Sequence, residues 1–314
     1  MKTKQPKTIA LELSSQCGLN CSYCDRQNWD ADVRRNRPHM DLGLFGQLVD
    51  EISEMMPQPQ ISLSFEGEST LHPEFIYMLE YLNEKKIRPW ITIRAKQAGK
   101  PELDALIQRC SAVSVSMELN ETAIGIKFVG DIIDLANPEI NDIELSVNHT
   151  LCPPDHLESP GVVKFIETVK EKVHEVYIWN KIDFGASITH SDIQGIELHL
   201  ERRRICKQPF SFLAVLSDGR VSPCCITSRT VFRTIDASNG IAAVLKSEEY
   251  RHFLNDHENM NLGRYICGRC DLWLDDWLAD EKRNIKLSKS RTVEAHFEGG
   301  TVRIEGGLQN TEYE

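Results

Sequence analysis

Short apolar runs alternate with longer segments of helical periodicity along the first two thirds of the chain. Apolar runs rich in β-branched and aromatic residues predict strands, and apolar residues three and four apart predict helices. The predicted strands are residues 9–13, 61–65, 90–94, 112–117, 143–148 and 175–179. The predicted helices are residues 44–55, 74–85, 102–109, 128–135 and 162–173. This alternation predicts an α/β fold with a parallel sheet and crossover helices.

The pattern changes after about residue 200, where two apolar runs flank Asp218-Gly219. Asp-Gly between apolar runs is a strong β-hairpin signal. The C-terminal tail alternates around Gly299-Gly300, which predicts a terminal hairpin. We therefore predict a large α/β domain at residues 1–200, a small α+β domain at 201–285 and a hairpin tail at 286–314.

Composition and charge exclude several classes of function. The chain has 314 residues, enough for a full hydrophobic core, and a net charge of −11, which argues against non-specific binding to nucleic acid. No apolar run approaches the roughly 18 residues of a membrane span. No apolar segment near the N-terminus is long enough for a signal peptide. We expect a cytoplasmic protein that binds neither nucleic acid nor membranes.

Ten cysteines without a signal peptide indicate metal binding in a reducing compartment rather than disulfides. Three of them, Cys17, Cys21 and Cys24, directly follow the first predicted strand. Three thiolates leave a four-site iron–sulfur cluster one protein ligand short, so one iron stays open to an exogenous ligand. A zinc site that lacks one ligand is the alternative.

The three cysteines, with Tyr23 before the last of them, resemble the CxxxCxφC signature of the radical S-adenosylmethionine (SAM) superfamily. The resemblance implies a [4Fe–4S] cluster on these cysteines and SAM chelating its open iron. An electron from an external donor such as flavodoxin or ferredoxin then cleaves SAM, and the resulting radical abstracts a substrate hydrogen atom. The resemblance also implies a partial (β/α)6 TIM-like barrel, with chemistry at the carboxyl ends of its strands.

The second predicted strand ends in Ser64-Phe-Glu66-Gly67-Glu68-Ser69, where the family has a GGEP-like stretch. Gly67 and Glu68 match that stretch, and Glu66 and Ser69 depart from its glycine and proline. The resemblance implies that the backbone of this turn and Glu68 meet the amino group of the methionine part of SAM. A solvated acidic turn is the alternative.

Three more residues are SAM contacts by the same resemblance. Tyr23 is expected near the adenine, and Ser116 near the ribose at the end of the fourth strand. Asn148, which we expect to end the fifth strand, faces the same edge of the sheet. Local turn chemistry is the alternative for Ser116 and Asn148.

The last third carries a second group of thiols. The hairpin predicted around Gly219 brings Cys206 and Cys224 together, and Cys267 and Cys270 form a CxxC pair. Four thiolates make a closed site. The pattern resembles the twitch domain, a shortened relative of the SPASM extension of radical SAM enzymes, and implies one auxiliary [4Fe–4S] cluster. A structural zinc ribbon is the alternative.

A closed cluster cannot bind substrate, but it can accept an electron. We therefore expect a radical SAM oxidoreductase that acts on a small-molecule or peptide substrate. The alternative is redox-neutral epimerisation, with Cys225 returning the hydrogen atom. Pro223-Cys224-Cys225 and Ile266-Cys267-Gly268-Arg269-Cys270 resemble stretches of radical SAM peptide epimerases. A packing role or a role as an alternative cluster ligand is the other interpretation of Cys225. A non-catalytic metal-binding regulatory module is the third hypothesis.

Overall fold

Two compact units make up the chain. The computed structural model describes residues 5–18, 38–94, 98–118, 131–132, 143–151, 160, 163–164, 167, 173, 175–180, 205–224, 232, 236–263, 265, 267, 284–288, 293–297 and 300–304. One unit combines Met1–Ile91 with Gly185–Leu278, and the other combines Thr92–Phe184 with Ala279–Glu314. Both cysteine groups therefore belong to the first unit. The domain boundaries predicted at residues 200 and 285 stay predictions.

All six predicted strands are confirmed. They are β1 (Thr8–Leu11), β2 (Gln60–Ser62), β3 (Trp90–Arg94), β4 (Ala112–Glu118), β5 (Glu144–Leu151) and β6 (Glu175–Asn180). The first three predicted helices are confirmed as α2 (Leu42–Glu54), α3 (Phe75–Glu84) and α4 (Lys100–Arg109). The helices predicted at 128–135 and 162–173 lie largely outside the described residues. The α/β class is therefore correct.

In the first unit, β1 lies between two parallel neighbours. One neighbour is β2, and the other is β7 (Phe212–Val215), which follows β1 by about two hundred residues. Strand β8 (Val221–Ser222) pairs antiparallel with β7 and lies at the edge, so the order is β8-β7-β1-β2-β3. Ile9, Ala10 and Leu11 have no exposed surface. The strand that precedes the cysteine motif is thus buried along residues 9–11, as expected for a central parallel strand.

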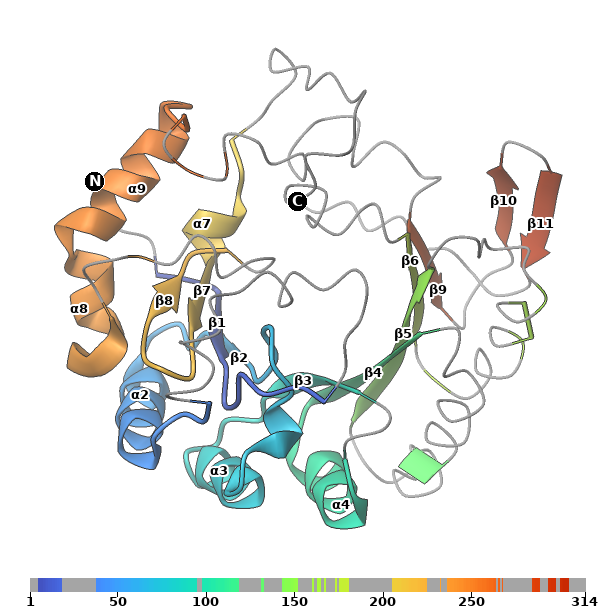
Figure 1. The fold of residues 1–314 in the computed structure, drawn as a ribbon, viewed down its shortest axis with the longest axis horizontal. Helices are drawn as coiled ribbons and strands as arrows, with labels where there is room; N and C mark the ends of the chain where they lie inside the picture. The colour runs from blue at the N-terminus through green and yellow to red at the C-terminus, as the bar shows by residue number, and fades with distance from the viewer. Residues whose placement is uncertain are drawn as a thin grey trace. The chain divides into compact units, whose positions relative to one another are not determined.

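Helices flank this sheet (Figure 1). Helices α2 and α3 lie on the outer side of β1 and β2, and α8 (Ile241–Lys246) and α9 (Glu248–Glu258) lie beside β7 and β8. Asp41 caps α2, because its Oδ1 accepts hydrogen bonds from the amides of Gly43 and Leu44 at 2.9 and 3.1 Å. The buried face of α2 repeats at helical spacing with Phe45, Leu48, Val49 and Ile52. None of the described helices is long and apolar enough to cross a membrane.

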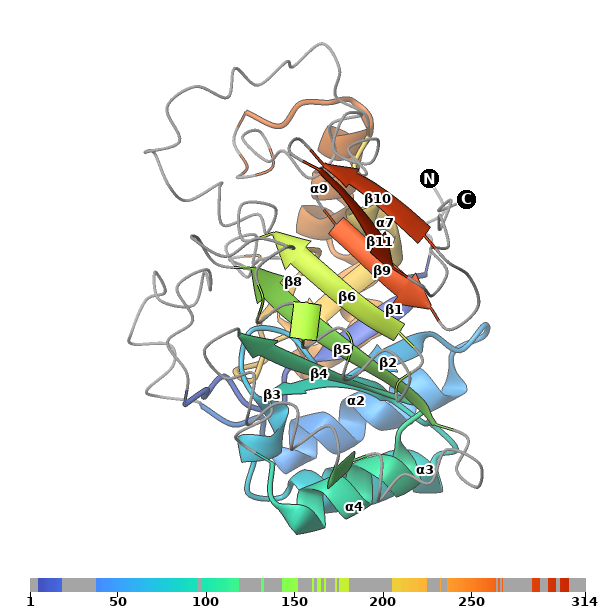
Figure 2. The ribbon, with the colours of Figure 1, turned by 90° about the vertical axis from the view of Figure 1, so that its right-hand side faces the viewer.

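The second unit also contains a sheet. Figure 2 shows β4, β5, β6 and β9 (Asn284–Ser288) side by side. Strands β4 to β6 are parallel, and β9 joins β6 antiparallel. Sequence analysis missed β9, although Ile285 and Leu287 alternate with polar residues there. The predicted terminal hairpin is confirmed as β10 (Val293–Phe297) and β11 (Gly300–Ile304).

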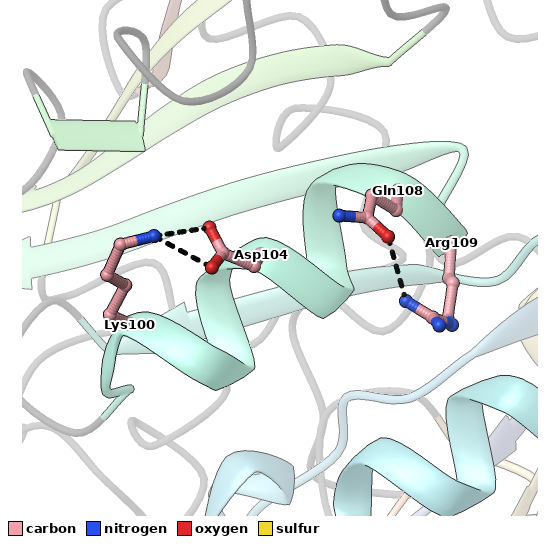
Figure 3. A network of polar contacts seen from close by, with 4 residues as sticks. All are labelled: Lys100, Asp104, Gln108 and Arg109. Atoms are coloured by element: carbon pink, nitrogen blue, oxygen red, sulfur yellow. Dashed lines mark hydrogen bonds and ion pairs between the residues drawn. The ribbon is translucent and has the colours of Figure 1, made fainter.

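Helix α4 carries its polar contacts on an exposed face (Figure 3). Lys100 Nζ lies 2.8 Å from Asp104 Oδ2 one turn away, and Arg109 donates to Gln108 Oε1 at 3.2 Å. Exposed pairs of this kind contribute little to stability. The opposite face, with Leu103, Ala105, Leu106 and Ile107, is buried. The packing of this face therefore holds α4 in place.

Two hydrogen bonds at the surface join α2 to α8, which are almost two hundred residues apart in sequence. Glu51 Oε2 accepts from the amide of Ile241, and Oε1 accepts from that of Ala242, each at 2.7 Å. The N-cap position of α8 is Gly240, which has no side chain to cap the helix. Glu51 therefore does the work of a capping residue from a neighbouring helix.

Replacing Glu51 by glutamine should lower the free energy of unfolding by about 1–2 kcal/mol, because the neutral amide can accept from only one of the two donors. Urea unfolding followed by circular dichroism measures this loss. Glu54→Gln is the matched control, since Glu54 is exposed on the same helix. Equal effects of the two substitutions would contradict the contact.

Candidate metal centres

The loop that carries the three-cysteine motif is held at both ends. The amide of Ser15 donates to Pro38 O, and that of Met40 donates to Leu13 O, each at 2.8 Å. These bonds close the long loop between residues 15 and 38 onto the carboxyl end of β1. Cys17 is half-buried at the start of the loop. Cys21, Tyr23 and Cys24 lie outside the described residues.

The turn after β2 packs directly against the start of this loop. The amide of Glu68 donates to Gln16 O at 2.7 Å, one residue before Cys17. A Cβ atom on Gly67 would lie 1.8 Å from Ser14 O and 2.6 Å from Ser15 Cα. Only glycine fits at that distance. The structure thus brings together the Gly67–Glu68 turn and the start of the loop that contains the first cysteine. The predicted contact of this turn with SAM stays a prediction.

Glu68 is buried within its own turn. Its side chain is 2% exposed, and Oε1 accepts from the amide of Thr70 at 3.2 Å and from the Thr70 hydroxyl at 2.6 Å. The Ser69 hydroxyl donates to Leu63 O, which closes the turn where the family motif has proline. The alternative interpretation of this segment as a solvated acidic turn is therefore wrong for Glu68. Its carboxylate is held in a defined position beside the cysteine loop.

Ser116 and Asn148 lie in the second unit. They are register partners on the parallel strands β4 and β5, and Ser116 is buried. The prediction that Asn148 ends its strand is wrong, because β5 runs on to Leu151 and pairs with β6 as far as Asn180. Thr150, a β-branched residue, favours this extension. Asn148 is therefore an inner strand position, and its proposed contact with SAM stays a prediction.

The hairpin predicted around Gly219 is confirmed. The amide of Gly219 donates to Leu216 O at 2.9 Å, and Gly219 has φ of +88°, a left-handed conformation that suits glycine. Cys206 precedes β7 and Cys224 follows β8, so both lie at the end of the hairpin opposite its turn. The strand order therefore places these two thiols together.

Three thiols of the second group influence each other electrostatically. Burial raises the pKa of Cys206 to about 11, with a smaller contribution from Cys224. Burial also raises the pKa of Cys267 to about 12, and Cys224 and Cys206 add to this shift. Mutual effects of this kind require the thiols to lie near one another. Segments far apart in sequence therefore converge on one cysteine-lined position.

The described residues hold no group of three histidine, cysteine or acidic side chains that could bind a single metal ion. Cys270, the predicted fourth ligand, and Cys225 lie outside these residues. A four-iron cluster needs thiolates that each meet a different iron, so three converging soft donors fit that cofactor.

Helix α9 organises the segments that carry these thiols. Tyr250 donates its hydroxyl hydrogen to Pro209 O at 3.1 Å, close to Cys206. Phe253 packs edge-on against Phe232 at 5.4 Å and against Tyr265 at 4.8 Å between ring centroids, and Tyr265 is two residues before Cys267. Burial lowers the pKa of His257, which stacks on Phe253. The aromatic cluster around Phe253 thus holds in place the segments that follow Cys206 and Cys224 and the segment that precedes Cys267.

Phe253→Ala should cost about 3–5 kcal/mol of stability, because it leaves a cavity in this cluster. We also expect it to reduce iron retained by the second cysteine group, since Phe232 and Tyr265 lose their shared support. Thermal unfolding and iron content measure the two effects. His252→Ala, an exposed change on the same helix, serves as control. Unchanged iron content in Phe253→Ala would contradict this role of α9.

Sequence analysis did not single out Glu12. Glu12 directly follows β1, and its buried carboxylate accepts a hydrogen bond from the amide of Gly67 at 3.2 Å. The only signal is one acidic residue within the apolar run Ile9-Ala-Leu-Glu-Leu13.

Comparison with known proteins agrees with this geometry. The family model SPASM, described as an iron-sulfur cluster-binding domain, matches residues 206–271, which include all four cysteines of the second group. A curated relative is the tungsten-containing aldehyde ferredoxin oxidoreductase cofactor-modifying protein of Pyrococcus furiosus, 26% identical over 128 residues. That stretch is 40% of this chain and 35% of the relative, so the chain matches only about a third of its length.

Two solved structures share the fold. BtrN in complex with AdoMet and 2-DOIA superposes with a TM-score of 0.54 at 18% identity, over 85% of this chain and 94% of BtrN. Streptococcus suis SuiB bound to S-adenosylmethionine gives a TM-score of 0.57 at 13% identity, over 80% of this chain and 68% of SuiB. The chain therefore shares its fold with BtrN and SuiB, and residues 206–271 match the SPASM iron–sulfur cluster-binding domain.

Proposed function

We propose that this protein is an enzyme that reductively cleaves SAM and removes a hydrogen atom from a small-molecule or peptide substrate. In this proposal Cys17, Cys21 and Cys24 would hold a [4Fe–4S] cluster and leave one ligand position for SAM. When bound, the cluster supplies the electron that breaks SAM. The observation that carries this proposal is the hydrogen bond between the Glu68 amide and Gln16 O, which sets the Gly67–Glu68 turn beside the first cysteine.

The turn suits the methionine part of SAM. An ammonium group needs acceptors, and a carboxylate gives the strongest charge-assisted hydrogen bonds. Glu68 is a buried carboxylate whose position is set by Thr70, so it meets an incoming ammonium without losing side-chain freedom. Gly67 lets the backbone come within contact of Ser14, which leaves the turn close to the cluster loop. These residues bind and orient SAM in the proposal.

The second group of cysteines holds an auxiliary [4Fe–4S] cluster in this proposal, with Cys206, Cys224, Cys267 and Cys270 as ligands. Buried thiols with raised pKa values stay protonated in the absence of metal. Metal binding then displaces these protons, as it does in other thiolate sites. Held by these four cysteines, the cluster would serve as the one-electron acceptor for the substrate radical, and the net reaction would be an oxidation or a bond formation.

Two kinds of substrate fit this proposal. BtrN is recorded with 2-DOIA, and SuiB is recorded bound to its precursor peptide SuiA. Our proposal therefore covers a small molecule or a peptide, with an external one-electron donor such as flavodoxin or ferredoxin as partner. Cys225 directly follows a proposed cluster ligand, and a role as hydrogen donor would convert the reaction to epimerisation.

The experiment is anaerobic reconstitution with iron and sulfide, then incubation with SAM and dithionite. We expect 5′-deoxyadenosine and methionine in equal amounts by liquid chromatography and mass spectrometry. Protein that retains iron but yields neither product is the result expected of a non-catalytic metal-binding module, and it would refute the proposal. With a substrate in hand, reaction in D₂O separates oxidation from epimerisation, because only the latter incorporates deuterium through Cys225.

A further inference from the structure

Glu12 carries a buried carboxylate that the proposed chemistry does not use. It is 1% exposed, and its own amide donates to Val215 O at 2.9 Å, which continues the pairing of β1 with β7. An unpaired charge in such a place costs several kcal/mol, so a buried carboxylate persists only with hydrogen-bond donors around it. The identity of these donors therefore defines what Glu12 does.

The donors come from two distant turns. Glu12 Oε1 accepts from the amide of Gly67, and Oε2 accepts from the amide of Ser217, each at 3.2 Å. The two donors are 55 and 205 residues away along the chain. One oxygen thus holds the turn proposed to receive SAM, and the other holds the turn of the β7–β8 hairpin. The carboxylate sets the spacing between the two turns.

The charges around Glu12 agree with this bridging role. Burial raises the pKa of Glu12, and the amides of Ser217, Gly67 and Glu66 oppose that shift by stabilising the charged form. Asp218 adds repulsion, and its own carboxylate is paired with Arg220 at 2.6 Å. Backbone amides are thus the groups that support charge at Glu12.

The hairpin leads from this bridge to the second cysteine group. Ser217 lies in the turn that the Gly219 amide closes onto Leu216 O. Strand β8 runs from this turn toward Cys224, which the family match includes in the iron–sulfur domain. A displacement of the hairpin therefore moves one of the amides that Glu12 holds, and with it the support of the Gly67 turn.

We propose that Glu12 is a positioning residue that ties the SAM-binding turn at Gly67 to the hairpin of the iron–sulfur domain. The proposal rests on the proposed function for the identity of the ligand at that turn. An ordered hairpin holds the Glu12 carboxylate in place, and the carboxylate in turn holds the Gly67 turn. One buried side chain therefore couples the SAM-binding turn to the iron–sulfur domain.

Two substitutions break the bridge from opposite ends. Glu12→Gln keeps the shape but places an amide NH2 against one backbone donor. Ser217→Pro removes the donating amide and leaves the carboxylate intact, at a central turn position that tolerates proline. Glu51→Gln is the matched control, because it weakens a different contact between an N-terminal helix and α8. All three are tested in the full-length protein reconstituted with iron and sulfide.

Two measurements decide the proposal. In hydrogen–deuterium exchange without SAM, we expect Glu12→Gln and Ser217→Pro to speed exchange of residues 63–70, whereas Glu51→Gln does not. In equilibrium dialysis, we expect the dissociation constant for SAM to rise about tenfold or more in the first two variants, because each variant loses one of the two buried hydrogen bonds at residue 12. The control should bind SAM as the unmodified protein does.

Unchanged exchange at residues 63–70 in both bridge variants would overturn the proposal. So would equal weakening of SAM binding by Glu51→Gln, because the effect would then reflect general stability. An unmodified protein that binds no SAM would refute the proposed function instead. In that case the exchange measurement still decides whether Glu12 links the two turns.

Discussion

Simultaneous replacement of Cys17, Cys21 and Cys24 by alanine is expected to abolish SAM cleavage and to leave the second cluster in place. The three thiolates are the proposed ligands of the cluster that delivers the electron, and they belong to the loop held at Ser15 and Met40. The rate should fall to the uncatalysed background, a loss on the order of 10⁶-fold for a typical enzyme. Iron should fall from about eight to about four atoms per chain.

The control for this experiment is Cys110→Ala. Cys110 is fully buried at the end of α4, in the second unit, and belongs to neither cysteine group. We expect this variant to keep its iron and its SAM cleavage at a modest cost in stability. Persistent SAM cleavage in the triple variant would contradict the assignment of the first cluster. Loss of all iron in that variant would contradict two independent sites.

Gly67→Ala is expected to have the second largest effect. The new Cβ would lie 1.8 Å from Ser14 O and 2.6 Å from Ser15 Cα, and both neighbours are backbone atoms that cannot rotate away. The turn must therefore move from the cysteine loop. We expect SAM affinity to fall by about 100-fold or more, since displacement of the turn costs roughly 3 kcal/mol. Equilibrium dialysis measures the affinity.

Gly46→Ala is a glycine control for the same measurement. Gly46 lies within helix α2, and a Cβ on it meets only Tyr81 Oη of α3 at 3.9 Å, an ordinary van der Waals contact. Alanine in a helix is favoured over glycine by roughly 0.5–1 kcal/mol, so this variant should be slightly more stable. Its SAM affinity should match that of the unmodified protein. Normal SAM binding in Gly67→Ala would show that the turn does not contact SAM.

Features set by local chemistry could be predicted from the sequence. Strand β1, helix α2 and the hairpin at Gly219 each follow from apolar spacing or from a turn residue within a few positions. The place of the cysteine motif directly after β1 also follows from the sequence, because the apolar run Ile9–Leu13 precedes it.

Features set by distant partners could not be predicted. Glu12 looks like one polar position in an apolar strand, and its role depends on amides 55 and 205 residues away. The same holds for the parallel pairing of β7 with β1 and for the cap that Glu51 provides to α8. The sequence predicts a strand end at Asn148, because local propensity does not show that β5 pairs with β6 as far as Leu151.

The central claim is that the first three cysteines hold a cluster with one iron open to SAM. Electron–nuclear double resonance of the reduced protein, with SAM carrying ¹⁵N in its methionine amino group, tests it most directly. Our account predicts a strong ¹⁵N coupling to the cluster, lost in the variant that lacks Cys17, Cys21 and Cys24. A spectrum that SAM leaves unchanged would contradict it.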